Sequence, residues 1–230
     1  MVSYIVENVI LAILDRMQKV CQNLADNIYY LYIMNRIFFI FCFLFLCMAG
    51  CKEKKEQAQI QAETFLLSDS RDGQEYKAVK IGQQIWMAGN LNYKTDDSWC
   101  YGNEESNCEK YGRLYTWNAA KDACPDGWHL PSRDEWNELV KIAGDNTAAK
   151  KLKSKTLWNG ADNYEFSALP GGAYYNDGSF NFIGDYSSWW SATEHNNNNA
   201  YNRYMNSISE VMLENNNEKN HAYYVRCVQD

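Results

Sequence analysis

Residues 124–136, which read CPDGWHLPSRDEW, contain the clearest structural signals in the chain. The Pro-Asp-Gly segment at 125–127 is typical of a tight turn, because proline presets φ and glycine accepts a positive φ. Ser132 and Glu135 have the spacing of a capping box, in which the hydroxyl and the carboxylate satisfy free amides at a helix start. The stretch therefore predicts a turn and then a helix beginning after Ser132, and nothing in it indicates a reaction centre.

The helix predicted from this stretch has one apolar face. Trp136, Leu139, Val140 and Ala143 recur at helical spacing, so one side of the helix should face a hydrophobic core. Gly144 is a suitable end for this helix, because glycine readily takes the left-handed conformation that closes a helix.

Length and charge limit the kinds of protein this chain can be. Its 230 residues are enough for one domain of roughly 150–200 residues with additional segments. The net charge of −7 belongs to residues 51–230, because the first fifty residues carry three basic and three acidic side chains. An acidic domain binds a phosphate backbone poorly, so we expect no nucleic-acid partner.

Residues 34–50 have the features of a signal peptide. Met34 and Arg36 precede an uncharged apolar run at 37–50, which is shorter than the roughly 20 residues that span a bilayer. The Met-Ala-Gly-Cys sequence at 48–51 resembles the lipobox of bacterial lipoproteins, in which the cysteine is lipidated and becomes the mature N-terminus. We expect lipidation at Cys51; the alternative is an ordinary signal anchor with an incidental cysteine.

The predicted lipid anchor defines the other segments. Residues 1–33 are interpreted as an over-extended gene start, with an unusually long n-region as the alternative. Residues 51–68 are rich in Lys, Glu, Gln and Ala and are predicted to be a tether. Lys52 is not the aspartate of a retention signal, so we expect the protein at the cell outer membrane, lipid-anchored and exposed on the surface.

The folded domain is predicted to cover residues 69–230 and to consist mostly of short strands. Four lysines at 150, 151, 153 and 155 are interpreted as solvated surface. A first helix should end before Cys124. Strands are expected near 76–81, 85–87, 166–169, 188–193, 201–205, 209–213 and 221–228, with a hairpin turn at 176–179.

Several phrases of the domain resemble, in this order, the Fibrobacter succinogenes major paralogous domain of bacterial surface lipoproteins. The resemblance covers about residues 69–230 and departs from the family at Gly89, where glutamate is usual. The phrases lie at 72–76, 85–93, 111–117, 127–131, 169–172, 189–191 and 225–228.

The chain also resembles, more distantly, the C-type lectin-like fold, which the formylglycine-generating enzymes share. This resemblance lies in residues 129–136 and in the Val-Arg-Cys segment at 225–227. It implies an α+β fold with two helices, small twisted antiparallel sheets, long loops on one face and termini brought together. The formylglycine-generating enzymes use a redox-active cysteine pair near copper. Calcium-dependent lectins use a Glu-Pro-Asn or Gln-Pro-Asp loop, and neither sequence occurs here.

Four of the eight cysteines lie in the predicted domain. Four cysteines allow three pairings, and an exported protein can oxidise them. We predict a local Cys100–Cys108 bridge, which leaves Cys124–Cys227; on the chain-entropy model they would contribute about 2.6 and about 4.7 kcal/mol. The alternative, a zinc site, is disfavoured because the spacing matches no compact ligand pattern.

The domain shows no catalytic pattern. His129 lies in the turn before the predicted helix and is interpreted as structural, and His195 and His221 as loop residues. No serine lies in a nucleophile-elbow sequence and no glycine-rich loop suits phosphate. We therefore expect a protein that is not an enzyme and that holds no cofactor or metal.

Asparagine is concentrated in residues 181–221, where 11 of 41 residues are Asn, against ten in the preceding 130. Interleaved Asn and Tyr are typical of recognition surfaces, although asparagine also fills loops well. We predict a surface that binds a polysaccharide or a protein; the alternatives are a structural envelope module and an enzyme of the formylglycine-generating type. The candidate ligand-binding residues are Tyr186, Asn196, Asn198, Tyr201, Asn202, Arg203, Tyr204, Asn206 and Asn216.

Overall fold

The computed structural model describes residues 15–27, 29, 32 and 63–230. The chain divides into two compact units, residues 1–59 and 60–230. In the first unit, residues 15–27 are helical and exposed. Among the described residues there is no helix with the length and apolarity needed to cross a bilayer. The predicted signal peptide, Cys51 and most of the tether lie outside the described residues.

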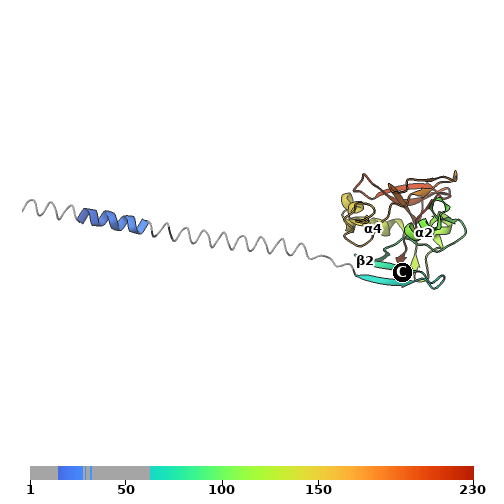
Figure 1. Ribbon diagram of the computed structural model, residues 1–230, viewed down its shortest axis with the longest axis horizontal. Helices are drawn as coiled ribbons and strands as arrows, with labels where there is room; N and C mark the ends of the chain where they lie inside the picture. Colours follow the sequence, from blue (N-terminus) through green and yellow to red (C-terminus); the bar gives the residue numbers. More distant parts are fainter. Residues whose placement is uncertain (1–14, 28, 30–31, 33–62) are drawn as a thin grey trace, which may run out of the picture. The chain divides into compact units, whose positions relative to one another are not determined.

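The second unit is an α+β domain whose two ends meet in one antiparallel sheet, drawn at the bottom of the domain in Figure 1. We predicted the tether to continue to residue 68, but its last five residues are a strand, paired in register with residues 75–79 of the strand β2 (Glu75–Ile81). Backbone hydrogen bonds to β2 hold this strand, while the side chain of Leu66 stays 69% exposed. The strand therefore lacks the alternation of buried and exposed residues from which a strand is predicted. The sheet order is β1 (Thr64–Ser68), β2 (Glu75–Ile81), β3 (Gln84–Met87), β13 (Val228–Gln229), β6 (Trp128–His129).

Two further sheets form the rest of the β structure. The second has the order β4 (Ser98–Trp99), β5 (Leu114–Thr116), β12 (Ala222–Tyr223), β7 (Ala173–Tyr174), β8 (Phe180–Asn181), and its last two strands flank the turn predicted at 176–179. The third, upper in Figure 1, contains β9 (Tyr186–Glu194), β10 (Asn199–Asn206) and β11 (Leu213–Glu218).

Strand β9 lies inside the molecule, as its bulky sequence predicts. On one side it pairs with β10, and on the other Tyr224 donates its amide to Ser188 at 3.0 Å. Three strand expectations were wrong. The strand predicted at 209–213 lies at Leu213–Glu218, residues 166–169 contain only an isolated bridge at Ala168, and residues 221–228 contain two short strands rather than one.

Helix α4 (Arg133–Ala143) confirms the helix predicted from the opening stretch. Ser132 Oγ accepts from the amide of Glu135 at 3.3 Å, and Glu135 Oε2 accepts from the amide of Ser132 at 2.7 Å. Gly144 ends the helix with φ 94°. The first predicted helix is only five residues long, α3 (Trp117–Lys121), and the described domain also contains the short helices α2 (Glu105–Tyr111) and α5 (Ala148–Leu152).

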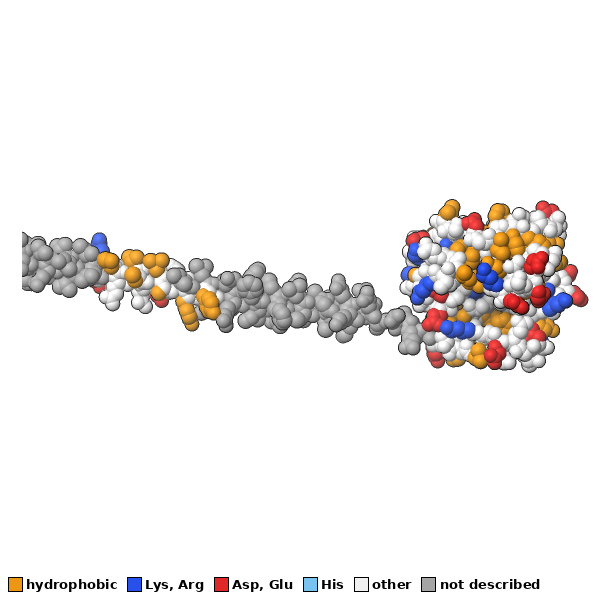
Figure 2. All heavy atoms as spheres, in the orientation of Figure 1, with side chains coloured by type: hydrophobic (Ala, Val, Ile, Leu, Met, Phe, Trp, Pro, Cys, Tyr) orange, Lys and Arg blue, Asp and Glu red, His pale blue; other side chains and the backbone are white. Residues whose placement is uncertain are grey.

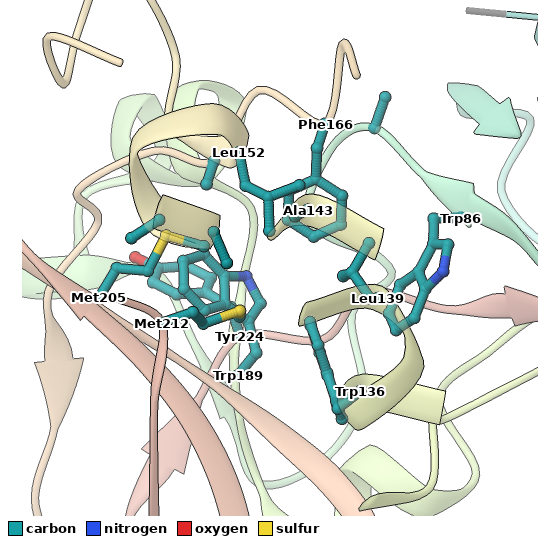
Figure 3. Packing of buried hydrophobic residues seen from close by; sticks show 14 of the residues in the cluster. Trp86, Trp136, Leu139, Ala143, Leu152, Phe166, Trp189, Met205, Met212 and Tyr224 are labelled. Carbon is teal, nitrogen blue, oxygen red and sulfur yellow. The ribbon is translucent and has the colours of Figure 1, made fainter. Parts of the chain in front are cut away.

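The core forms on both sides of the second sheet, because neighbouring strand residues point to opposite faces. On one side, Trp86 packs on Trp136 of α4 with ring centroids 4.6 Å apart, and Figure 3 shows this pair with Leu139 between α4 and the first sheet. On the other side, Tyr223 packs on Trp190 at 4.5 Å. Both faces of the sheet are therefore needed to bury the aromatic side chains.

Both predicted disulfides are present, Cys100–Cys108 and Cys124–Cys227. The long bridge joins the turn before β6 to the segment before β13. One of the four lysines interpreted as solvated is instead buried: Lys153 is 4% exposed, and its Nζ donates to the carbonyls of Asn206 at 2.5 Å and Ser209 at 2.7 Å.

Candidate ligand-binding surface

The nine candidate residues do not form one surface. They lie on β9, β10, β11 and the turn between β9 and β10, but the third sheet separates them into two groups. On β10 and β11, Tyr201 pairs with Asn216 and Arg203 with Glu214, on the face toward α4. Tyr204 and Asn206 belong to the other face, with Tyr186 of β9.

The face toward α4 is occupied by internal contacts. The guanidinium of Arg133 lies 4.4 Å from the ring centroid of Tyr201 and donates to Glu214 at 2.7 Å. Arg203 is 8% exposed and reaches Glu214 at 3.0 Å and also Asn137. Hydrogen bonds from Arg133, and then the charge of Arg203, hold the pKa of Glu214 below its ordinary value despite partial burial. This face therefore fastens α4 to the sheet and offers few free groups to a ligand.

The turn between β9 and β10 supports the interpretation of asparagine as a loop-former. Asn196 Oδ1 accepts from the amides of Asn198 and Asn199, both at 2.9 Å, which is the local bonding that favours asparagine in turns. Asn198 is exposed. Asn216 accepts at 3.1 Å from Asn199 Nδ2. Two of these candidates, Asn196 and Asn216, thus bond to their own loop and sheet.

A row of aromatic rings runs from Tyr204 and Tyr186 of the third sheet to the segments that follow β7 and β8 and precede β12. Tyr186 and Tyr204 have centroids 5.5 Å apart, Phe182 lies 6.0 Å from Tyr186, and Tyr175 lies 6.3 Å from Phe182 and 5.0 Å from His221. We call these five side chains the aromatic row. Four of them are half-buried and Phe182 is 55% exposed, so the row presents ring faces and edges to solvent while resting on the sheet.

Phe182 is held outward by its backbone. Its φ is +68°, a left-handed value that is a true outlier for a bulky residue. The carbonyl of Phe182 accepts from the amides of Asp185 at 3.1 Å and Tyr186 at 3.0 Å, which fixes this turn. Such strain costs on the order of 1–3 kcal/mol and is concentrated at functional sites in proteins. The fold therefore stabilises an exposed ring at a position where a loop would ordinarily carry glycine or asparagine.

The polar atoms of the row suit a neutral ligand. The hydroxyls of Tyr175 and Tyr204 have no hydrogen-bond partner among the residues that the structure describes. Burial raises the pKa of Tyr175 and of Tyr186, and burial lowers the pKa of His221. Tyr175, Tyr186 and His221 are therefore uncharged at neutral pH, and each can both donate and accept.

Asn202 belongs to this side but is not available to a ligand. It is 1% exposed, donates to Ser188 Oγ at 2.7 Å and accepts from Asn217 Nδ2 at 2.9 Å. We therefore remove Asn202 and Arg203 from the candidate surface, because both are buried with internal partners.

Sequence reasoning missed Tyr175, Phe182 and His221. The sequence signal for this region was Phe-Ile-Gly-Asp at 182–185, a turn sequence expected at the surface that nevertheless contains two large apolar residues.

Two other clusters have chemistry-bearing side chains. His129 contacts Asp230 through Nδ1 at 2.7 Å and Glu135 through Nε2 at 2.8 Å, so both ring nitrogens are occupied, which agrees with a structural role. Cys100, Glu105 and Cys108 lie within 4.8 Å of one another. The two sulfurs are joined in a disulfide, so they are not thiolate ligands.

Comparison with known proteins agrees with the phrases seen in the sequence. The Fibrobacter succinogenes major domain matches residues 79–229, well over half of the chain. No curated protein and no solved structure matches the chain. Across residues 79–229, which include α4, both disulfides and the aromatic row, this chain belongs to the Fibrobacter succinogenes major domain family.

Proposed function

We propose that this chain is a non-catalytic recognition protein of the cell surface, which binds a polysaccharide or a protein through the aromatic row. The observation that carries the proposal is Phe182, an apolar ring 55% exposed and held by a left-handed backbone. When a large exposed ring binds a ligand, no polar group of the ring is desolvated, and only two side-chain torsions are fixed. Aromatic residues therefore give contact area at low entropic cost.

The surroundings of the row fit recognition rather than chemistry. The tyrosine hydroxyls can hydrogen-bond a ligand, and ring faces can pack on its apolar surface. Figure 2 shows hydrophobic side chains exposed in patches between acidic and basic ones on the face in view. A mixed surface of this kind suits a partner with both apolar and polar groups.

The proposal includes a C-type lectin-like arrangement of the domain. Three features support it: β1 and β13 bring both ends of the domain into one sheet, α4 packs across the core, and the long connections carry most of the exposed polar residues.

The proposal also places the protein at the outer membrane on a lipid attached to Cys51, after removal of a signal peptide at 34–50. Its support is the apolar run followed by Met-Ala-Gly-Cys. A globomycin-type inhibitor of the lipoprotein peptidase should cause the precursor to accumulate. If Cys51→Ala were processed normally and still reached the membrane fraction, the lipid anchor would be wrong.

Ligand binding can be tested with matched exposed positions. The full-length protein is screened on a polysaccharide array and in pull-downs from envelope extracts, alongside Phe182→Ser and Ile208→Ser. Ile208 is 93% exposed and lies outside the row, so its substitution should leave capture unchanged, whereas Phe182→Ser should reduce it. Capture by none of the proteins, or equal capture by all three, would favour the alternative of a structural envelope module.

A further inference from the structure

A concave surface lies beside the second sheet and shares no residue with the aromatic row, although Tyr174, Asn176 and Asn220 of its lining are sequence neighbours of Tyr175 and His221. It is a cleft of about 410 Å³, within the range of roughly 300–1,000 Å³ typical of small-molecule sites. Its lining includes Asp97, Trp99, Asn118, Tyr174, Asn176 and Asn220. The cleft therefore combines two large aromatic rings with several amides.

The aromatic wall is a consequence of the sheet. Trp99 of β4 and Tyr174 of β7 are stacked, with centroids 4.6 Å apart and an interplanar angle of 22°, although β5 and β12 lie between their strands. Between them the register places Thr116 opposite Ala222, and Ala222 opposite Tyr174. Thr116 and Ala222 beside Tyr174 are small, whereas Trp99 itself is in register with Leu114, and the two rings meet over this part of the sheet. The wall is therefore preformed.

Several polar side chains of the cleft are free. Asn118 and Asn220 are exposed, and their amides, like the carboxylate of Asp97, make no hydrogen bond within the part of the chain that the structure describes. Asn176 is partly engaged, since its Nδ2 donates to Glu218 at 2.5 Å. A free side-chain amide offers two N–H donors and one carbonyl acceptor. Two such amides can therefore hydrogen-bond neighbouring hydroxyl groups of a ligand.

The charge of the cleft disfavours anions. Lys219 also lines it, but its side chain is 14% exposed, its ammonium pairs with Glu194, and it donates to the carbonyl of Asn197 at 3.0 Å. Asp97 has no ion-pair partner among the described residues. With a net charge of −7 for the chain, the local and overall fields both repel a negatively charged ligand.

We propose that this cleft is a binding site for a neutral saccharide. A pyranose ring has an apolar C–H face, which packs on the negative face of an aromatic ring, and a rim of hydroxyls, which amides bind by donating and accepting. Trp99 supplies the first, since Tyr174 already packs on Trp99 and on Phe180 at 4.8 Å and so supports the wall from behind, and Asn118 and Asn220 supply the second. The site shares no side chain with the aromatic row, so either proposal can fail without the other.

The test is affinity electrophoresis of the full-length protein in gels containing neutral polysaccharides (β-glucan, xylan, mannan, arabinogalactan) or anionic ones (polygalacturonate, alginate). At least one neutral polysaccharide should retard the protein, with little change when salt is added, and the anionic ones should not. The double variant Asn118→Ala/Asn220→Ala should bind that polysaccharide at least about tenfold more weakly, because it loses the hydrogen bonds of two side chains. Both side chains are exposed and unpartnered, so the fold should be unaffected.

Asn163→Ala is the matched control. Asn163 is exposed, lies outside the cleft and should bind as the unmodified protein does, and Trp99→Phe should retain part of the affinity. Binding to no neutral polysaccharide, stronger binding to an anionic one, or full binding by the double variant would each overturn the proposal. If Phe182→Ser abolished the same binding while the double variant did not, the saccharide would be assigned to the aromatic row.

Discussion

Asn90 Oδ1 accepts a hydrogen bond from Arg226 Nε at 2.9 Å, between two side chains buried in the centre of the domain. The same oxygen accepts from Trp189 Nε1 at 2.8 Å, and Asn90 Nδ2 donates to the carbonyl of Tyr111 at 2.7 Å. The other partners of Arg226 are carbonyl oxygens, including that of Ser167 at 3.1 Å. Burial lowers the pKa of Arg226 to about 9, so the guanidinium is still charged at neutral pH.

We expect Asn90→Ala to be among the more damaging substitutions in the domain. It removes the acceptor of the Arg226 Nε–H and of the Trp189 indole N–H, and the donor to the Tyr111 carbonyl, and such losses cost about 2–5 kcal/mol. Urea denaturation at pH 7 measures the effect, with Asn163→Ala as the exposed control that should stay within about 0.5 kcal/mol. Similar stability of the two variants would show that the Asn90 network does not hold the core together.

The long disulfide should matter more than the short one. On the chain-entropy model, replacing Cys124 and Cys227 by serine removes about 4.7 kcal/mol, whereas replacing Cys100 and Cys108 removes about 2.6 kcal/mol. Denaturation of the two double variants without reductant compares them directly. A larger loss for the short bridge would mean that local packing, rather than restriction of the unfolded chain, determines the contribution of each disulfide.

Lys153 and Lys155 provide a test of burial within one short segment. Lys153→Met leaves the carbonyls of Asn206 and Ser209 without their donor and should destabilise the domain by about 1–3 kcal/mol. Lys155 is exposed, so Lys155→Met should change stability by less than about 0.5 kcal/mol. Thermal unfolding of both variants is the measurement, and equal midpoints would contradict a structural role for Lys153.

His129 should make stability depend on pH. Burial by itself lowers the pKa of His129, but the hydrogen bonds and charges of Asp230 and Glu135 outweigh it, so the net pKa lies above the ordinary 6.5. Its stabilisation is therefore complete below pH 6.5 and is lost as pH rises through the raised folded-state value. His221 acts in the opposite direction, because burial lowers its pKa.

Comparison with His129→Gln isolates this contribution, since His221 is present in both proteins. The difference in free energy of unfolding between the two proteins should be larger at pH 5.5 than at pH 9. A difference that stays constant across this range would indicate that His129 is not charged between its two carboxylates.

Local signals explain what could be predicted from sequence. The capping box at Ser132 and Glu135 and the turn before β8 depend on a few adjacent residues, and both are present. Helices α3 and α5 have five residues each, too few for a helical period to be visible. The buried position of Lys153 depends on a contact with residues 53 and 56 positions away, which no local pattern encodes.

The candidate surface was only partly predictable, for a reason that lies in β10. Its register with β9 shifts between Ala200 and Asn202, and Asn202 and Arg203 are both buried. Simple alternation along the strand therefore fails to tell which side chains face out. Composition pointed to β9, β10 and β11, but the sheet places Tyr201 and Tyr204 on opposite faces.

Tyr201 and Tyr204 give the most direct test of recognition by the aromatic row, because they lie on one strand and on opposite faces of the sheet. Tyr201 packs beneath Arg133 and contacts His195 Nδ1 at 3.0 Å, whereas Tyr204 has a free hydroxyl beside Tyr186. Ligand capture and thermal unfolding are measured for Tyr201→Ala and Tyr204→Ala. We predict that Tyr204→Ala weakens capture at least about tenfold, which corresponds to about 1.4 kcal/mol, with little change in unfolding temperature. Tyr201→Ala should instead lower the unfolding temperature and leave capture nearly unchanged. Unchanged capture by Tyr204→Ala, or a loss of stability equal to that of Tyr201→Ala, would contradict the assignment of the row as the binding surface.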